Sequence, residues 1–367
     1  NDLKDLKIGL VLASKADEIM SPKTIEFFPK IKDVLNKILH SNEHMIRIIL
    51  PKIISNNPSA FFENDFNLIE IFQSLANDPS QEIRLAFLDS FWHLFRLASS
   101  WNQNDKESLK SFLIPLFKDP SQLIRDKLCS SVVYSTLGTE RLISIIPSFI
   151  ELVSSIQNYR TFSEAIKTFL SWPNKVIFNF WIQLSPIVNN AAKKFPHALS
   201  STVSSFYSKA SIFMDDEMEA QLEGIIITDY AESTDYRMRE IFPKIAGGFC
   251  FKTQRLSLVR SMWNRIRDCE SNDSVVSVRG KVIPQLVKFR IYFHESGQID
   301  LENEVVSKFI EIRKINHCDT TNPNSNNNDG IQNSEGIQNS MPQKNCNEIE
   351  NHALSDKEMS ERLYMKD

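Results

Sequence analysis

Apolar residues recur at intervals of three and four positions along most of the chain, in segments of about 12 to 20 residues. One such segment carries Ile83, Phe87 and Phe91, which fall on one face of a helix. No segment shows the sustained apolar–polar alternation of a half-buried strand. The pattern therefore predicts an all-α protein with about 16 helices between Leu3 and Ile315.

A seven-residue segment recurs together with its apolar surroundings. Asp78–Arg84 (DPSQEIR) returns 41 residues later as Asp119–Arg125 (DPSQLIR). The apolar positions before it return at the same offset: Leu68, Ile71, Phe72 and Leu75 match Leu109, Phe112, Leu113 and Leu116. Each unit is therefore predicted to be an apolar helix, a tight Asp-Pro turn and a second helix.

Weaker copies keep the offset of six residues between a Ser or Asp and an Arg. They are Ser41 with Arg47, Ser233 with Arg239, and Asp273 with Arg279. Successive arginines are 37, 41, 114 and 40 residues apart, and we interpret 114 as three steps of 38 that contain three degenerate repeats. A period near 40 with two helices per unit is typical of HEAT repeats. The predicted fold is therefore an all-α, HEAT-type α-solenoid of about eight antiparallel helix pairs.

The turn residues have clear physical roles. Asp78 and Asp119 are expected to be N-caps, with Pro at the first helical position and Gln at the third. The Arg that follows has two open interpretations. It either pairs with the adjacent repeat, as one step of a ladder, or it contacts a partner protein directly.

Beyond the predicted solenoid, residues 1–316, the composition changes. Residues 317–353 are rich in Asn, carry a tandem GIQNS duplication and hold few large apolar side chains, so we expect disorder. Residues 354–367 are predicted to form a short helix at most, because Ser355–Glu358 resembles a capping box. Since the chain begins at Asn1 and not at Met, we expect a fragment or a trimmed chain.

Composition excludes several classes of function. Nine glycines in 367 residues argue against phosphate-binding loops and against an all-β fold. A net charge of −4 favours no nucleic-acid partner, and no apolar run is long enough to cross a membrane. Five cysteines, Cys129, Cys250, Cys269, Cys318 and Cys346, never form C-x-x-C, which is typical of free thiols in a reducing compartment. The predicted location is the cytoplasm, with the nucleus as a further location.

Catalytic and cofactor signatures are missing from the sequence. None of the H-E-x-x-H, G-x-S-x-G, Walker A or G-x-G-x-x-G patterns occurs. His40 and His44 have metal-ligand spacing, but Ser41-Asn42 is expected to break the helix between them. We therefore expect no enzyme activity, no cofactor, no metal and no small-molecule substrate.

The repeated turns resemble those of the scaffold (A) subunit of protein phosphatase 2A, and of the related regulatory subunit of protein phosphatase 4. The resemblance rests on the Asp–Arg pairs and on the likeness of Arg47–Ile53 to Arg239–Ile245. It covers roughly Thr24 to His294 and departs between Thr139 and Tyr230 and in the Asn-rich tail.

The resemblance implies a non-catalytic scaffold whose turns form a ridge for a phosphatase catalytic subunit and a targeting subunit. The partner-binding residues would then be Arg47, Asp78, Arg84, Asp119, Arg125, Arg239 and Arg279. The alternative is a karyopherin-like nuclear transport receptor, or another HEAT-repeat adaptor that binds proteins.

Overall fold

The structure is a computed structural model, and it describes residues 37–42, 44–56, 68–97, 113–130, 134 and 138–318. Within these ranges the regular elements are all helices, as predicted, and no strand occurs. The predicted segments 317–353 and 354–367 lie outside the described residues, except for His317 and Cys318 at the end of the last helix. The chain divides into two units, Asn1–Arg313 and Lys314–Asp367, and the repeated helix pairs belong to the first.

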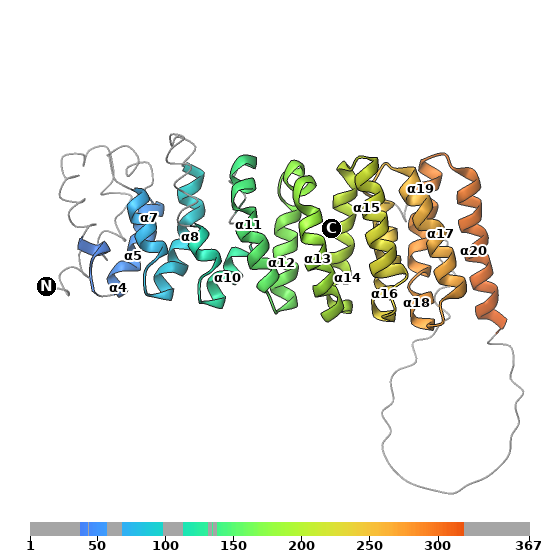
Figure 1. The fold of residues 1–367 in the computed structure, drawn as a ribbon, viewed down its shortest axis with the longest axis horizontal. Coiled ribbons are helices and arrows are strands. Elements are labelled where there is room, and N and C mark those ends of the chain that lie inside the picture. The colour runs from blue at the N-terminus through green and yellow to red at the C-terminus, as the bar shows by residue number, and fades with distance from the viewer. Residues whose placement is uncertain are drawn as a thin grey trace, which may run out of the picture. The chain divides into compact units, whose positions relative to one another are not determined.

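The helices follow one another in pairs along the first unit (Figure 1). In chain order they are α4 (His44–Arg47), α5 (Ile49–Asn56), α7 (Leu68–Ala76), α8 (Gln81–Leu97), α10 (Gln122–Leu128), α11 (Thr139–Ser155), α12 (Tyr159–Leu170), α13 (Asn174–Lys194), α14 (Pro196–Ala210), α15 (Asp216–Ile226), α16 (Tyr236–Phe249), α17 (Leu256–Asn272), α18 (Val276–Gly280), α19 (Ile283–Glu295) and α20 (Ile299–Cys318), with the 3-10 helix η4 (Ser211–Phe213) and the π-helix η5 (Ile227–Ala231). Short turns join the two helices of each pair.

Two layers result from this pairing. The second helices of successive pairs pack on one another, α12 on α14, α14 on α16 and α16 on α19, and the first helices α11 and α13 do the same. Each pair therefore contacts chiefly the pairs next to it, as expected of a repeat array. The apolar stripes predicted from the sequence face the space between the layers, where Phe87, Phe149 and Trp263 are fully buried.

The middle of the array holds two pairs without the Asp–Arg motif, α11–α12 and α13–α14. The prediction of three degenerate repeats between Arg125 and Arg239 was therefore wrong by one. Three steps of the period pass only two intermediate turns, because the third step reaches α16, which carries Arg239 itself. Aromatic packing is dense here: the ring centroids of Phe149 and Trp172 are 4.8 Å apart.

A buried polar network joins α13 to the π-helix η5. Asn189 Oδ1 accepts hydrogen bonds of 2.5 Å from both Tyr207 and Tyr230, and Asn189 Nδ2 donates to Asp229 Oδ2 at 2.5 Å. Ser185 lies 2.9 Å from the Tyr207 hydroxyl. Since these groups satisfy one another inside an apolar core, they fix how the two repeats align.

Candidate protein-interaction surface at the repeat turns

Arg84 lies in the first turn of α8, just after the turn that joins α7 to α8, and is held from two sides. Its Nη1 donates to the backbone carbonyl of Asp78, six residues earlier, at 2.6 Å. Its Nε and Nη2 donate to the two carboxylate oxygens of Asp119, in the next repeat, at 2.6 and 3.0 Å. A planar guanidinium suits this two-point grip on a carboxylate.

Arg47 and Arg239 repeat this arrangement. Arg47 binds the Ser41 carbonyl at 2.5 Å and the Asp78 carboxylate at 2.7 and 3.0 Å. Arg239 binds the Ser233 carbonyl at 2.8 Å and the Asp273 carboxylate at 2.7 and 3.2 Å. The offset of six residues in the sequence therefore has a structural cause, because each of these arginines binds the backbone carbonyl of the residue six positions before it.

The carboxylate side of the contact is also fixed by the backbone. Asp78 Oδ1 accepts from the amide of Ser80 and Asp119 Oδ1 from the amide of Ser121, both at 2.8 Å. These bonds close a turn in front of the helix, and the helix itself begins only at Gln81 or Gln122.

The predicted N-caps were therefore misplaced. Ser121, not Asp119, is the N-cap of α10. The carbonyls of Ser80 and Ser121 likewise accept the first helical hydrogen bonds, from Arg84 and Arg125. The helices therefore begin two residues later than predicted, at Gln and not at Pro, because Pro and Ser belong to the turn that the Asp side chain closes. From this turn the Asp carboxylate also reaches the arginine of the preceding repeat.

We call this run of contacts the Asp–Arg ladder, and most of it is shielded from water. The side chains of Arg84 and Asp119 are only 11% and 4% exposed. The hydrogen bond from Arg239 lowers the pKa of Asp273, while burial opposes that shift. The hydrogen bond that Arg47 donates to Asp78 raises the pKa of Arg47, and the one that Arg239 donates to Asp273 raises the pKa of Arg239. In the Arg239–Asp273 pair, the contact thus favours the charged form of both partners.

The ladder runs in two separate stretches. The first joins Arg47, Asp78, Arg84, Asp119 and Arg125, and the second joins Arg239, Asp273 and Arg279. The structure therefore brings the seven sequence-predicted residues together in these two groups, with the pairs α11–α12 and α13–α14 between them.

Each stretch ends on an arginine that forms no ion pair with a described residue of the next repeat. Arg125 bonds its own turn at Asp119 and turns its Nη2 to Gln122 at 2.5 Å. Asn158 takes the place of the next aspartate, since its Oδ1 accepts from the amide of Arg160 at 2.8 Å. Arg279 binds the Asp273 carbonyl at 2.5 Å.

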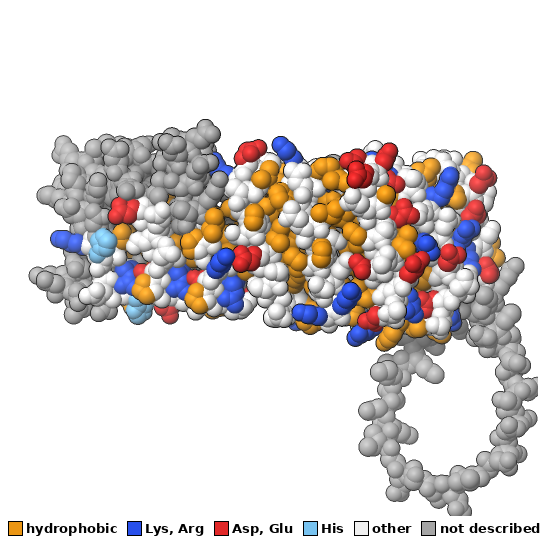
Figure 2. All heavy atoms as spheres, in the orientation of Figure 1, with side chains coloured by type: hydrophobic (Ala, Val, Ile, Leu, Met, Phe, Trp, Pro, Cys, Tyr) orange, Lys and Arg blue, Asp and Glu red, His pale blue; other side chains and the backbone are white. Residues whose placement is uncertain are grey.

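Exposed apolar side chains line the same turns. In the first turns of three second helices, α4, α10 and α18, Met45 is 56% exposed, Leu123 58% and Val276 70%, whereas α8 carries the polar Glu82 at this place. Tyr159 and Tyr236 are exposed at the corresponding turns. We call these five residues the turn edge. Figure 2 shows basic and apolar side chains alternating over α4 to α10.

The sequence reasoning did not single out the turn edge. A signal was present in the sequence. An apolar residue stands two or three positions before several of the turn arginines, and Met45, Leu123 and Val276 at these positions are exposed. This signal is weaker than that of the repeated Asp and Arg, because Arg84 has the polar Glu82 at the equivalent position.

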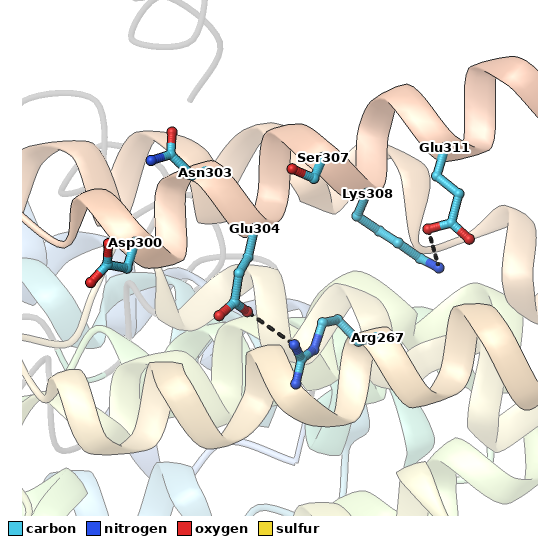
Figure 3. Close-up of a pocket in the computed structure, with 7 residues that line it drawn as sticks. All are labelled: Arg267, Asp300, Asn303, Glu304, Ser307, Lys308 and Glu311. Atoms are coloured by element: carbon cyan, nitrogen blue, oxygen red, sulfur yellow. Dashed lines mark hydrogen bonds and ion pairs between the residues drawn. The ribbon is translucent and has the colours of Figure 1, made fainter.

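An open groove of about 390 Å³ lies between α17 and α20 (Figure 3). Its walls are charged, and the charges pair with each other: Arg267 lies 3.0 Å from Glu304, and Lys308 lies 2.5 Å from Glu270 and 3.2 Å from Glu311. No group of three or more potential metal ligands occurs in the described ranges. None of the helices described there is long and apolar enough to cross a membrane.

No family model and no curated protein matches the chain. Among solved structures, importin beta superposes with a TM-score of 0.60 at 8% identity, over 81% of this chain and 40% of importin beta. Kap121p bound to Nup53p gives 0.48 at 13% identity, over 72% of this chain and 34% of that one. An engineered protein gives 0.45 at 12% identity, over 83% and 79%.

The chain thus spans less than half the length of importin beta, and at 8% identity the likeness concerns the fold alone. Together with the paired helices and the period near 40, it confirms the predicted architecture. This protein is an all-α helical solenoid of the HEAT-repeat type.

Proposed function

We propose that this chain is a non-catalytic adaptor that holds protein partners along its turn edge. The observation that carries the proposal is the exposure of apolar side chains at Met45, Leu123 and Val276, next to a buried ladder. Apolar groups exposed at regular places favour a protein partner. The ladder keeps neighbouring turns in register, so the surface needs little reordering on binding.

A karyopherin-like nuclear transport receptor is the first candidate within this class. It is favoured by the fold likeness to importin beta over 81% of the chain. This candidate predicts partners whose binding depends on a small GTPase, and it places the protein in both cytoplasm and nucleus.

A scaffold subunit of a serine/threonine phosphatase of the 2A or 4 type is the second candidate. The Asp–Arg pairs in successive turns favour it, because they carried the resemblance in sequence. Here Arg125 and Arg279 are the arginines best placed to meet a partner, since neither forms an ion pair with a described residue of the next repeat. Arg47, Arg84 and Arg239, with Asp78 and Asp119, would act mainly by holding the turns in place.

Affinity purification followed by mass spectrometry tests the adaptor proposal. The tagged chain is compared with a variant in which Met45, Leu123, Tyr236 and Val276 are replaced by Ser. A matched control replaces Ile114, Ile182, Ile299 and Ile310 by Ser, four exposed apolar residues outside the turn edge. We expect the turn-edge variant to lose partners that the control retains, with similar melting of both.

The identity of the partners separates the two candidates. Release of the partners by a small GTPase loaded with a GTP analogue supports the karyopherin-like candidate. Capture of phosphatase catalytic subunits supports the scaffold candidate. Any phosphatase activity of the captured material should disappear when the partner is removed from it. Equal capture by the turn-edge and control variants, or turnover by the purified chain alone, contradicts the proposal.

A further inference from the structure

A group of lysines lies where α16 and α19 pack side by side. On α16, Lys244 and Gly247 are followed by Phe251 just after the helix, at helical spacing along one stripe. On the neighbouring helix Gln285 and Lys288 form a second stripe, which Lys281 precedes.

The two stripes run alongside each other in register. In the middle, Gln285 lies over Gly247, so close that a Cβ on this glycine would overlap the amide. At one end, the ammonium of Lys288 lies 5.7 Å from the centre of the Phe251 ring. At the other end Lys244 and Lys281 repel each other. Glycine therefore allows the helices to approach closely and brings three lysines onto one surface.

These lysines have no acidic partner among the described residues. Lys244 donates instead to the hydroxyls of Ser201 at 2.5 Å and Ser200 at 3.5 Å. Burial is the main cause that lowers the pKa of Lys244 and of Lys288. Repulsion by a neighbouring lysine adds to this effect at both residues, while Cys250 opposes it at Lys288. Lys308 differs, since two glutamates lie within 3.2 Å of it. Positive charge has thus been gathered here without compensation, in a chain whose net charge is −4.

Two other features accompany the charge. Phe251 is 47% exposed beside Lys288 and offers an apolar contact. Gln285 is only 8% exposed, yet its Oε1 has no hydrogen-bond partner in the described part of the chain. A surface with separated cations and an exposed aromatic ring suits an extended peptide better than a single compact anion.

We propose that Lys244, Lys281, Lys288 and Phe251 form a docking site for an acidic peptide segment of a protein partner. Carboxylates bind the ammonium groups, and an apolar side chain packs on the phenylalanine. Lys244 and Phe251 are seven positions apart, about 10 Å along the direction of α16, and Lys288 lies beside Phe251. About three residues of an extended peptide therefore cover the distance between the two ends of the site. The site therefore favours acidic residues about three positions apart. This inference rests on the proposed adaptor function and names the chemistry of one partner.

Fluorescence anisotropy with a labelled acidic peptide tests the site. The probe is a ten-residue peptide with glutamates three positions apart and one leucine, and its glutamine analogue is the reference. We expect the full chain to bind the glutamate peptide at least tenfold more tightly than the analogue, and less tightly as salt rises. Replacing Lys244, Lys281 and Lys288 by Gln should lower the affinity at least tenfold.

A matched variant removes the same charge elsewhere. Lys175, Lys193 and Lys194 are exposed on α13, and changing all three to Gln should alter the affinity less than twofold. The melting temperatures of both triple variants show whether they fold. If the Lys244, Lys281, Lys288 variant has a lowered melting temperature, the single substitution Lys281→Gln, at an exposed residue, replaces it in the binding experiment. Equal loss in the two triple variants overturns the proposal, as does preferential binding of inorganic polyphosphate over the peptide.

The partner capture described above separates this inference from the adaptor proposal. If wild type and the Lys244, Lys281, Lys288 variant capture the same partners and the peptide does not bind, the adaptor function stands and the acidic site is refuted. If the wild type captures no specific partner, the adaptor proposal itself fails.

Discussion

The guanidinium of Arg84 holds the carboxylate of Asp119, 35 residues further along the chain, through two hydrogen bonds of 2.6 and 3.0 Å. The same arginine binds the carbonyl of Asp78 in its own turn. One side chain therefore connects the turns of two adjacent repeats, at a place where water is largely excluded.

Breaking this pair should destabilise the protein strongly. Arg84→Ala leaves a buried carboxylate without its partner, and we expect the free energy of unfolding to fall by about 3–5 kcal/mol. Lys167→Ala removes the exposed Lys167–Glu164 pair and should cost about 0–1 kcal/mol. Urea denaturation measures both. Equal effects of the two substitutions would show that burial does not strengthen the ladder.

Extending the ladder across its gap should stabilise the array. In Asn158→Asp, a carboxylate replaces the amide at the position where Asp119 and Asp273 meet the preceding arginine. We expect a gain of about 1 kcal/mol from an ion pair with Arg125. The new charge also lies at the N-terminus of α12, which by itself is favourable.

The same substitution in an Arg125→Ala background separates these two effects. Thermal melting should show a larger gain from Asn158→Asp when Arg125 is present. An identical gain in both backgrounds would mean that the helix terminus, and not the ladder, is responsible.

The glycines of two helices should respond oppositely to alanine. Gly247→Ala places a methyl group against Gln285 and should destabilise by about 1–3 kcal/mol. Gly224→Ala meets no atom within 4 Å in α15 and should stabilise by about 0.5–1 kcal/mol. Adding Gln285→Ala should recover part of the loss at Gly247. Denaturant midpoints of the three variants check this, and failure to recover would place the strain elsewhere.

The buried thiols should make the protein less stable at alkaline pH. Burial raises the pKa of Cys129 to about 12 and also raises that of Cys250. A thiol in the unfolded chain ionises near pH ~8.5, so above this pH the folded state binds more protons and unfolding becomes easier. The stability contributed by the protonated thiols is complete below pH ~8.5 and is lost as pH rises toward the folded pKa.

Denaturation midpoints at about pH 7.5 and 9.5, with reductant, measure this loss, since tyrosines ionise only near pH 10. A variant with Cys129→Ala and Cys250→Ala should depend less on pH over the same interval. A slope unchanged by these substitutions would assign the pH dependence to other groups.

The sequence alone predicted the repeat period and the all-α fold class. It also indicated that Asp and Arg are the residue types that interact at the turns. Apolar spacing is a local property, so it identified the faces that carry Ile83, Phe87 and Phe91 without any knowledge of neighbouring helices. The offset of six between Asp78 and Arg84 was likewise visible, because the arginine reaches a carbonyl within its own turn.

Only the tertiary structure decided what those residues contact. Asp119 serves Arg84 of the previous repeat, and a partner 35 positions away has no signature in the local pattern. The sequence alone therefore could not show that these ion pairs are buried. Stacking of the repeats excludes water from these pairs, and it also places Lys244 of one repeat beside Lys281 of the next. Burial and electrostatic environment depend on which surfaces meet, and that is set by packing between repeats rather than by the order of residues within one.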